Sequence, residues 1–337
     1  MRKLNVAVVG LGRLGMVHAY NVAWQIPNAR LSAVCTHNQP GIDYARDQLG
    51  NPRLYDDYQQ LLADPDIDAV VIVTSSDKHC AQAAAALDAG KHVFTEKPLG
   101  VDVESCRQVA AAVARHPDRT FMIGFMRRYD VSYAYAMDKI RSGAIGKPYL
   151  VKATALDPDA QAAEFIKYTK HSAGIFLDLG IHDLDLMRWY LGSEISEVYA
   201  AGATFKHPEF HQLGDDETAV ATMRFANGAL GQMHIGRTAP HGYHVETEIV
   251  GTEGTIRVSA IPAKNRAELF TAAGELTECV EGFQQRFADS YLAEVREFVD
   301  CALTGRQPEV TVQDGLRSVE AALACKQAWQ TGKPVQL

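Results

Sequence analysis

A short apolar segment that runs directly into a glycine-rich turn constrains the fold of this chain more than any other feature. Residues 4–9 (LNVAVV) have the pattern of a buried strand, and Gly10-Leu11-Gly12-Arg13-Leu14-Gly15 follows at once, before a helical pattern over residues 18–25. In this spacing the first glycine permits a tight turn, the second lets a pyrophosphate approach the backbone, and the third allows close packing of strand against helix. The motif therefore predicts a dinucleotide site at a helix N-terminus, contacted by Gly10 through Gly15.

Alternating strand and helix patterns continue from this motif to about residue 123. Apolar, often β-branched runs occur at residues 31–35, 69–74, 92–95 and 121–123, with helical patterns over residues 81–89 and 105–115. Such alternation predicts a doubly wound parallel sheet of the Rossmann type, an α/β fold. We therefore expect a dinucleotide-binding domain over residues 1–123.

The pattern changes at Gly124, after which longer, alternating strands appear. Residues 218–225 and 230–235 alternate apolar and polar side chains and are joined by Asn227-Gly228, which is a hairpin signal. We expect a second, α+β domain over residues 124–337, with a large open, mostly antiparallel sheet backed by helices and two C-terminal helices that only pack. Since the other sheet face also needs covering, we expect a homo-oligomer, most simply a homotetramer, built through this sheet.

The composition bounds the possible partners. The net charge is -8, 22% of the residues are charged, and no long basic run occurs, so neither nucleic acid nor a membrane surface is expected as a partner. We find no apolar span of membrane length and no signal segment before the first strand. The six cysteines lack metal-binding spacing, so we expect no metal site and a reducing, cytoplasmic location.

Further cofactor contacts are expected where the strands of the first domain end. The second strand leads into Thr36-His37-Asn38, and no Asp or Glu stands there to hold the ribose of NAD. These residues can bind a ribose, but His37 with Arg46 could also meet a 2′-phosphate, so NAD is expected and NADP stays open. The other candidate cofactor contacts are Thr74, Ser75, His79, Glu96 and Lys97.

Residues 174–185 (GIFLDLGIHDLD) place polar side chains on an otherwise apolar helical pattern. In a helix, Asp178 and His182 are spaced i,i+4 and His182 and Asp185 i,i+3, so one face carries a carboxylate, an imidazole and a second carboxylate. An imidazole beside a carboxylate in apolar surroundings is an acid/base candidate, although a buried histidine with satisfied hydrogen bonds explains the pattern equally well. Lys97 follows a sheet strand, where it would point toward the dinucleotide, although most lysines simply lie on the surface.

Taken together, these motifs resemble the Gfo/Idh/MocA family of oxidoreductases. The resemblance rests on the glycine turn with His18, on Glu96-Lys97-Pro98, on residues 124–129 (GFMRRY) and on the Asp178/His182 helix, and it covers essentially the whole chain. Within the family the chain looks like the inositol 2-dehydrogenases, which implies NAD as cofactor and Lys97, Asp178 and His182 as catalytic residues. Residues 155–159 (ALDPD) replace a histidine-rich segment of members that oxidise myo-inositol, which is similar to members that prefer scyllo-inositol.

The resemblance implies NAD-dependent oxidation of a cyclitol secondary alcohol, scyllo-inositol to 2-keto-myo-inositol. His182 would accept the hydroxyl proton, Asp178 would orient the imidazole, and Lys97 would stabilise the alkoxide or accept the proton itself. The candidate substrate-binding residues are Arg127, Asp157, Asp185 and Tyr243. Of these, Tyr243 could equally be a packed aromatic and Asp157 a turn residue. The alternatives are a myo-inositol or aldose dehydrogenase, and a non-catalytic regulator that senses a dinucleotide or sugar.

Overall fold

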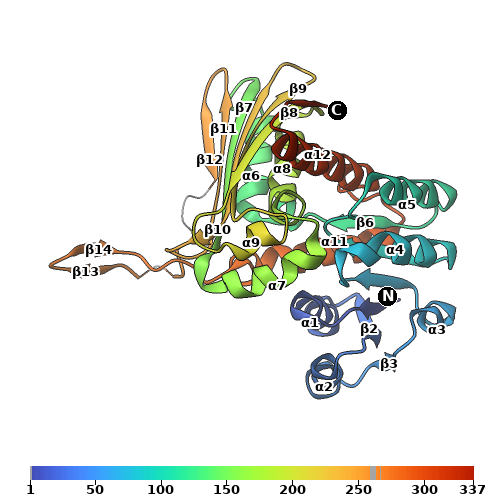
Figure 1. The fold of residues 1–337 in the computed structure, drawn as a ribbon. Helices are drawn as coiled ribbons and strands as arrows, with labels where there is room; N and C mark the ends of the chain where they lie inside the picture. The colour runs from blue at the N-terminus through green and yellow to red at the C-terminus, as the bar shows by residue number, and fades with distance from the viewer. Residues whose placement is uncertain (1, 259–262, 266) are drawn as a thin grey trace. The chain divides into compact units, whose positions relative to one another are not determined.

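The computed structural model describes residues 2–258, 263–265 and 267–337 (Figure 1). The chain forms two compact units, Met1–Tyr129 with Asp289–Val319, and Asp130–Ala288 with Glu320–Leu337. The division after Tyr129 lies close to the boundary expected after residue 123. However, residues 289–319, which we assigned to the second domain, belong to the first unit.

The first unit contains a six-stranded sheet in the order β3-β2-β1-β4-β5-β6, in which each neighbouring pair is parallel. The strands are β1 (Leu4–Val9), β2 (Ala29–Cys35), β3 (Arg53–Tyr55), β4 (Ala69–Ile72), β5 (His92–Glu96) and β6 (Phe121–Gly124). The strand order reverses between β1 and β4, which confirms the predicted doubly wound fold. In such sheets, ligands bind outside the carboxyl ends of the strands at this reversal.

Helices cover both faces of this sheet. They are α1 (Arg13–Tyr20), α2 (Gln39–Gln48), α3 (Tyr58–Ala63), α4 (His79–Asp88), α5 (Val103–Arg115) and α11 (Ala288–Thr304), with short η1 (Asn21–Gln25), η2 (Ser76–Lys78) and η3 (Met126–Tyr129). Helices α1 and α2 pack together on one face, and α4 and α5, which are neighbours in Figure 1, pack together on the other. Helix α12 (Val312–Thr331) contributes its first residues to this unit and the rest to the other.

Helix α11 returns to the first unit because its apolar stripe completes that unit's core. Val295, Phe298 and Val299 belong to the same buried cluster as Val8 of β1 and Ala19 of α1. The sequence pattern predicts one uninterrupted C-terminal domain, which is wrong for residues 289–319. The apolar stripe of residues 285–303 predicted a packed helix but carried no information on which sheet it covers.

The second unit contains a seven-stranded sheet in the order β12-β11-β7-β10-β9-β8-β15. The strands are β7 (Pro148–Pro158), β8 (Ile195–Ala203), β9 (Thr218–Phe225), β10 (Leu230–Ala239), β11 (His244–Gly251), β12 (Thr255–Val258) and β15 (Val335–Gln336). Strands β10 and β7 are parallel and the other neighbouring pairs are antiparallel, which confirms the mostly antiparallel sheet. The predicted hairpin is also confirmed, with Arg224 of β9 opposite Leu230 of β10.

The inner face of this sheet is covered by helical segments of the same unit. Segments η4 (Asp159–Gln161), α7 (Ala162–Ser172), η5 (Phe176–Gly180) and α8 (Ile181–Leu191) contact β7 or β10, and α6 (Val131–Arg141) contacts β12. The unit also contains the short helices α9 (Glu209–Gln212) and α10 (Phe283–Arg286). Segment η5 lies against β10 so closely that a Cβ at Gly180 would be 3.2 Å from side-chain atoms of Ile235 and Met233. Strands β13 (Leu269–Thr271) and β14 (Gly274–Leu276) form a ribbon that extends from the large sheet in Figure 1.

Candidate functional site

The turn after β1 contains three glycines, and the space around each one differs. Gly10 has φ +91, and a Cβ there would lie 2.7 Å from the carbonyl oxygen of Val73. A Cβ at Gly15 would lie 1.9 Å from the carbonyl oxygen of Gly10, so only glycine lets α1 start this close to β1. A Cβ at Gly12, in contrast, would meet nothing within 4 Å. Two glycines therefore serve packing, and the third borders open space.

That open space lies at the N-terminus of α1. Gly12 is the N-cap residue, with φ -78, and no side chain caps the helix there. The first amides of a helix lack intrahelical acceptors and carry the positive end of the helix dipole, which suits a phosphate group. Together with the strand reversal beside it, this geometry fits the pyrophosphate of a dinucleotide.

The end of the second strand is tied to the glycine turn through Asn38. Its Oδ1 accepts from the amide of Gly41 (2.6 Å), and its Nδ2 donates to the carbonyl oxygen of Leu11 (3.3 Å) and to Oγ1 of Thr36 (2.9 Å). Thr36 is buried, whereas His37 is exposed. Of these three predicted ribose contacts, Thr36 and Asn38 thus shape the turn, and both His37 and Asn38 are exposed.

His79 connects two of the predicted cofactor segments. Its ring is 1% exposed, with Nδ1 2.7 Å from the carbonyl oxygen of Pro98 and Nε2 3.1 Å from that of Thr74. Thr74 and Ser75 are half-buried beyond β4. Burial lowers the pKa of His79, although both carbonyl contacts oppose this shift. Any effect of His79 on a cofactor would act through the two turns that it holds together.

The Glu96-Lys97-Pro98 turn follows β5 and contains a cis peptide bond between Lys97 and Pro98. Glu96 is buried, and its Oε2 accepts from the amide of Lys97 (3.1 Å), while Oε1 lies 2.7 Å from Nε2 of His18. Lys97 itself is half-buried. Both carboxylate oxygens of Glu96 thus have partners within the protein. One of them holds the main-chain amide of Lys97 at the end of β5.

Arg127 lies in η3, directly after β6, and is 1% exposed. Strands β5 and β6 end together, with Glu96 opposite Gly124, so the turn with Lys97 and the segment with Arg127 leave the sheet at the same edge. The neighbouring Arg128 donates to Asp314 (2.8 Å). The first unit thus brings Lys97 and Arg127 to the ligand-binding edge of its sheet.

In the second unit, Asp178 lies in the π-helical segment η5, and His182 and Asp185 lie in α8, which continues it directly. We expected a continuous α-helix, and the structure instead inserts a π-helical turn where residues 176–180 pack on β10. Such turns are common at functional sites because they re-aim side chains without ending the helix. His182 is 6% exposed and Asp185 is 1% exposed.

Arg237 of β10, which sequence analysis did not single out, holds Asp178. Its guanidinium lies 3.2 Å from Oδ2 of Asp178, donates to Oγ1 of Thr169 (2.9 Å) and is 3.8 Å from Oδ2 of Asp215. The Arg237 side chain has no exposed surface. The sequence contained a signal for this role. Alternate residues of a strand point to the same face, so Arg237 lies on the inward face with Met233 and Ile235.

Asp215 shares this guanidinium with Asp178 and fixes the start of η5. Its Oδ1 accepts from the amide of Ile175 (3.0 Å). Burial raises the pKa of Asp215, and Arg237 opposes that shift. The unit therefore places one buried cation between two carboxylates, one of which belongs to the predicted catalytic set.

Asp157 and Tyr243, two predicted substrate-binding residues, lie at one edge of the second sheet. Strands β7 and β11 pair as far as Leu156 and His244. Asp157 is the next residue on β7, and Tyr243 directly precedes β11. Asp157 is 5% exposed and Tyr243 is 2% exposed. The Tyr243 ring packs edge-on against Phe287, with 6.2 Å between ring centres, which supports the packing role that the sequence left open.

The chain is similar to known oxidoreductases along its length. Residues 4–125 match the model "Oxidoreductase family, NAD-binding Rossmann fold" of Gfo/Idh/MocA proteins, and residues 137–337 match the family's "C-terminal alpha/beta domain". The expectation of an NAD-binding domain of this family is thereby confirmed. In the described part of the chain, no helix has the length and apolar character needed to cross a membrane.

Individual relatives are similar over nearly the full length. The scyllo-inositol 2-dehydrogenase (NAD(+)) of Bacillus subtilis is 36% identical, covering 99% of this chain and 96% of the relative. Scyllo-inositol dehydrogenase from Lactobacillus casei, solved with NAD(H) and scyllo-inositol, is 38% identical with a TM-score of 0.96, covering 99% of both chains. Myo-inositol 2-dehydrogenase from Lactobacillus plantarum is 35% identical with a TM-score of 0.97, covering 100% of both chains.

Substitution of two glycines separates cofactor binding from packing. We expect Gly12→Ala to leave the free energy of unfolding unchanged and to weaken NAD binding about tenfold or more, since the methyl group enters the space for the pyrophosphate. Gly15→Ala should instead lower the free energy of unfolding by about 1–3 kcal/mol, because its Cβ meets backbone. Calorimetric NAD titration and urea unfolding measure the two quantities. Equal effects of both variants on both quantities would contradict these roles.

Removal of Arg237 should destabilise the protein strongly. Arg237→Met leaves the buried Asp215 and the half-buried Asp178 without this cation. Loss of one partner of a buried pair costs about 3–5 kcal/mol. The deficit should shrink as the pH falls from 8 to 5, because protonation removes the uncompensated charge. The matched control is Arg115→Met, whose 55% exposed side chain pairs with Asp88 at the surface of the first unit. Urea unfolding that shows equal losses for both variants would contradict the assignment.

Proposed function

Because the chain belongs to the Gfo/Idh/MocA family of oxidoreductases, we propose that it is an NAD-dependent inositol 2-dehydrogenase that oxidises scyllo-inositol to 2-keto-myo-inositol. The observation that carries this proposal is the full-length similarity to two scyllo-inositol dehydrogenases, one at 36% identity and one at 38%. The presence of Lys97, Asp178 and His182 supports catalysis. A protein that only senses a dinucleotide or sugar would not need a proton-transfer set.

The cofactor in this proposal is NAD. Gly12 and the N-terminus of α1 would hold its pyrophosphate, and Thr36, His37 and Asn38 would lie toward its ribose. When bound, NAD supplies the nicotinamide that accepts a hydride from the substrate carbon. The absence of an acidic residue after β2 leaves NADP as an alternative that direct assay must compare.

Oxidation of a secondary alcohol also requires removal of the hydroxyl proton. We assign this step to His182, whose imidazole can accept a proton near neutral pH. Asp178, one turn earlier, would orient the imidazole and stabilise its protonated form. Arg237 lies 3.2 Å from Asp178 and keeps this carboxylate in place in a largely dry interior.

Lys97 would stabilise the negative charge that develops on the reacting oxygen. Glu96 accepts a hydrogen bond from the amide of Lys97, so the lysine side chain extends from a fixed backbone position. Lys97 could also accept the proton itself, and His182 is then the second acid/base group. Discrimination among the hydroxyl groups of a cyclitol is assigned to Arg127, Asp157, Asp185 and Tyr243.

Myo-inositol is the second candidate substrate. The similarity to myo-inositol 2-dehydrogenase from Lactobacillus plantarum, with a TM-score of 0.97, favours it. Residues 155–159 (ALDPD) favour scyllo-inositol, because they replace the histidine-rich segment associated with myo-inositol oxidation. We rank scyllo-inositol first on this ground.

We further propose that the protein is a cytoplasmic homotetramer assembled through the outer face of the seven-stranded sheet. The six cysteines are thiols, which suits a reducing compartment. Tyr199, Val220 and Leu230 are 45%, 51% and 44% exposed, and neighbouring strands place them on that outer face. Exposed apolar side chains on an open sheet face favour burial against another copy.

Val220→Glu tests the assembly. We expect it to shift the protein from a tetramer to a smaller species, because a buried carboxylate without a partner opposes association. Sedimentation or light scattering measures the mass. The control Val131→Glu changes an 81% exposed valine outside the sheet and should leave the mass unchanged. A wild-type monomer, or equal masses for both variants, would contradict this interface.

The activity is tested with scyllo-inositol, myo-inositol and glucose, each with NAD and NADP, by NADH or NADPH absorbance. We expect the highest kcat/KM for scyllo-inositol with NAD. His182→Ala and Lys97→Ala should each lower kcat by about 10²–10⁴-fold, because a positioned acid/base group contributes that much. NAD binding should persist in both variants.

Matched controls are His211→Ala and Lys333→Ala, which change exposed side chains of the same types. Both should retain wild-type turnover. Turnover of none of the three polyols with either cofactor would overturn the proposed function. A regulator would retain its biological effect after His182→Ala or Lys97→Ala, whereas loss of NAD binding in both variants would contradict their catalytic roles.

A further inference from the structure

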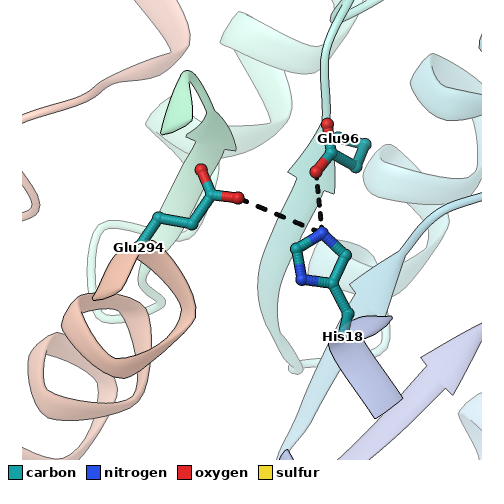
Figure 2. Close-up of side chains that lie close together, drawn as sticks. All are labelled: His18, Glu96 and Glu294. Carbon is teal, nitrogen blue, oxygen red and sulfur yellow. Dashed lines mark hydrogen bonds and ion pairs between the residues drawn. The ribbon is translucent and has the colours of Figure 1, made fainter. Parts of the chain in front are cut away.

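Three titratable side chains meet in the interior of the first unit (Figure 2). They are His18 of α1, Glu96 at the end of β5 and Glu294 of α11, and their exposed fractions are 0%, 4% and 0%. Nε2 of His18 lies 2.7 Å from Oε1 of Glu96 and 4.0 Å from Oε1 of Glu294. The rings of Phe94 and Tyr291 pack edge-on against the imidazole, with 5.6 Å between centres in each case. We call these three residues the His18 cluster.

The two carboxyl groups of the cluster have unequal surroundings. Glu96 accepts a hydrogen bond from the amide of Lys97 on one oxygen and lies next to His18 with the other. Neither oxygen of Glu294 has a hydrogen-bond partner in the described part of the chain. A carboxylate without donors in a dry interior is unfavourable, whereas the protonated acid is tolerated. The surroundings thus suit a charged Glu96 and an uncharged Glu294.

The groups that face Glu294 do not offset this preference. They are Glu96 from β5, the His18 ring from α1, and Tyr129 from η3. Burial, followed by the charge of Glu297, raises the pKa of Tyr129, so this residue does not supply a positive charge. On α11 itself Tyr291 is nearby, and Glu297 pairs with Arg306 instead. Desolvation, followed by the charge of Glu96, raises the pKa of Glu294 well above its ordinary value.

The surroundings of the His18 ring indicate which of its nitrogens carries the proton. Nδ1 of His18 is buried and has no hydrogen-bond partner in the described residues, which suits a neutral ring with its proton on Nε2. That N–H donates to Glu96. A bound metal ion explains the geometry less well, because two ligands of one tetrahedral ion, each about 2.0–2.1 Å from it, lie about 3.3 Å apart. The 2.7 Å separation of His18 and Glu96 is a hydrogen-bond distance.

We propose that Glu294 carries a proton at neutral pH and that His18 is a positioning residue for Lys97. With Glu294 uncharged, Glu96 is the one carboxylate that attracts the N–H of His18, and its other oxygen holds the amide of Lys97. An ionised Glu294 would compete for the same N–H and repel Glu96, which would loosen the turn. The consequence for Lys97 rests on the proposed function, whereas the proton on Glu294 does not.

The proton is tested through stability, without any activity measurement. Above about pH 5 an unfolded glutamate has lost its proton, whereas folded Glu294 keeps it, so unfolding of the wild type releases one proton that Glu294→Gln lacks. The unfolding equilibrium constant of the wild type, divided by that of Glu294→Gln, should rise about tenfold per pH unit up to the pKa of folded Glu294. A ratio that stays constant from pH 5 to 8 would overturn the proposal.

Glu297→Gln is the matched control on the same helix. Arg306 lowers the pKa of Glu297, so both folded and unfolded forms are ionised above pH 5, and the corresponding ratio should stay constant. Infrared difference spectra between the wild type and Glu294→Gln should contain the stretching band of a protonated carboxyl group. Absence of this band would overturn the proposal. So would one zinc ion bound per wild-type chain and none bound to Glu294→Gln, because a metal requires the ionised carboxylate.

Kinetics test the positioning of Lys97. His18→Phe keeps a ring but removes the donor to Glu96, and we expect it to lower kcat about 10–100-fold with KM and NAD affinity nearly unchanged, because the lysine is misplaced rather than lost. His18→Gln restores a donor and should recover most of kcat, and Glu294→Gln should retain it. An unchanged kcat in His18→Phe, or parallel losses of kcat and NAD binding, would overturn the positioning role. A wild type without turnover would overturn the proposed function alone, since the stability and infrared measurements still decide the proton.

Discussion

The constraint on which both units depend is that a charge removed from water needs a partner. In the second unit, Arg237 is fully buried between Asp178 and Asp215, and one cation compensates two carboxylates. In the first unit, Glu96 bonds to His18 and to the amide of Lys97, while Glu294 has no hydrogen-bond donor among the described residues, which favours the uncharged acid. The residues assigned to the chemistry are therefore fixed by polar groups that stand at inward positions of apolar strands and helices.

Close backbone approach provides the other half of the arrangement. The glycine turn lets α1 begin directly against β1, and Gly12 borders open space at the helix N-terminus. In the second unit, Gly180 lets the π-helical segment that carries Asp178 lie on β10, within reach of Arg237. In both places the absence of a side chain brings a functional group to its partner, because a Cβ would hold the two elements apart.

Sequence analysis predicted the doubly wound sheet, the β9–β10 hairpin and the family, because local periodicity and short motifs encode them. It gave the C-terminal helices no role beyond packing, yet α11 carries Glu294 and completes the core of the first unit. It also missed Arg237, although the alternation along β10 placed this charge on the inward face. In both cases a charged residue at an apolar position was the available signal.

The sequence by itself determined the order of the elements, the glycine turn and the residue types that the proposed reaction needs, since these depend on neighbours along the chain. Only the tertiary structure decided which groups share a buried charge: Arg237 with Asp178, and His18 with Glu96 and Glu294. These partners are separated by tens to hundreds of residues. Their ionisation depends on distances of a few ångströms and on exclusion of water, which arise only when distant segments pack together.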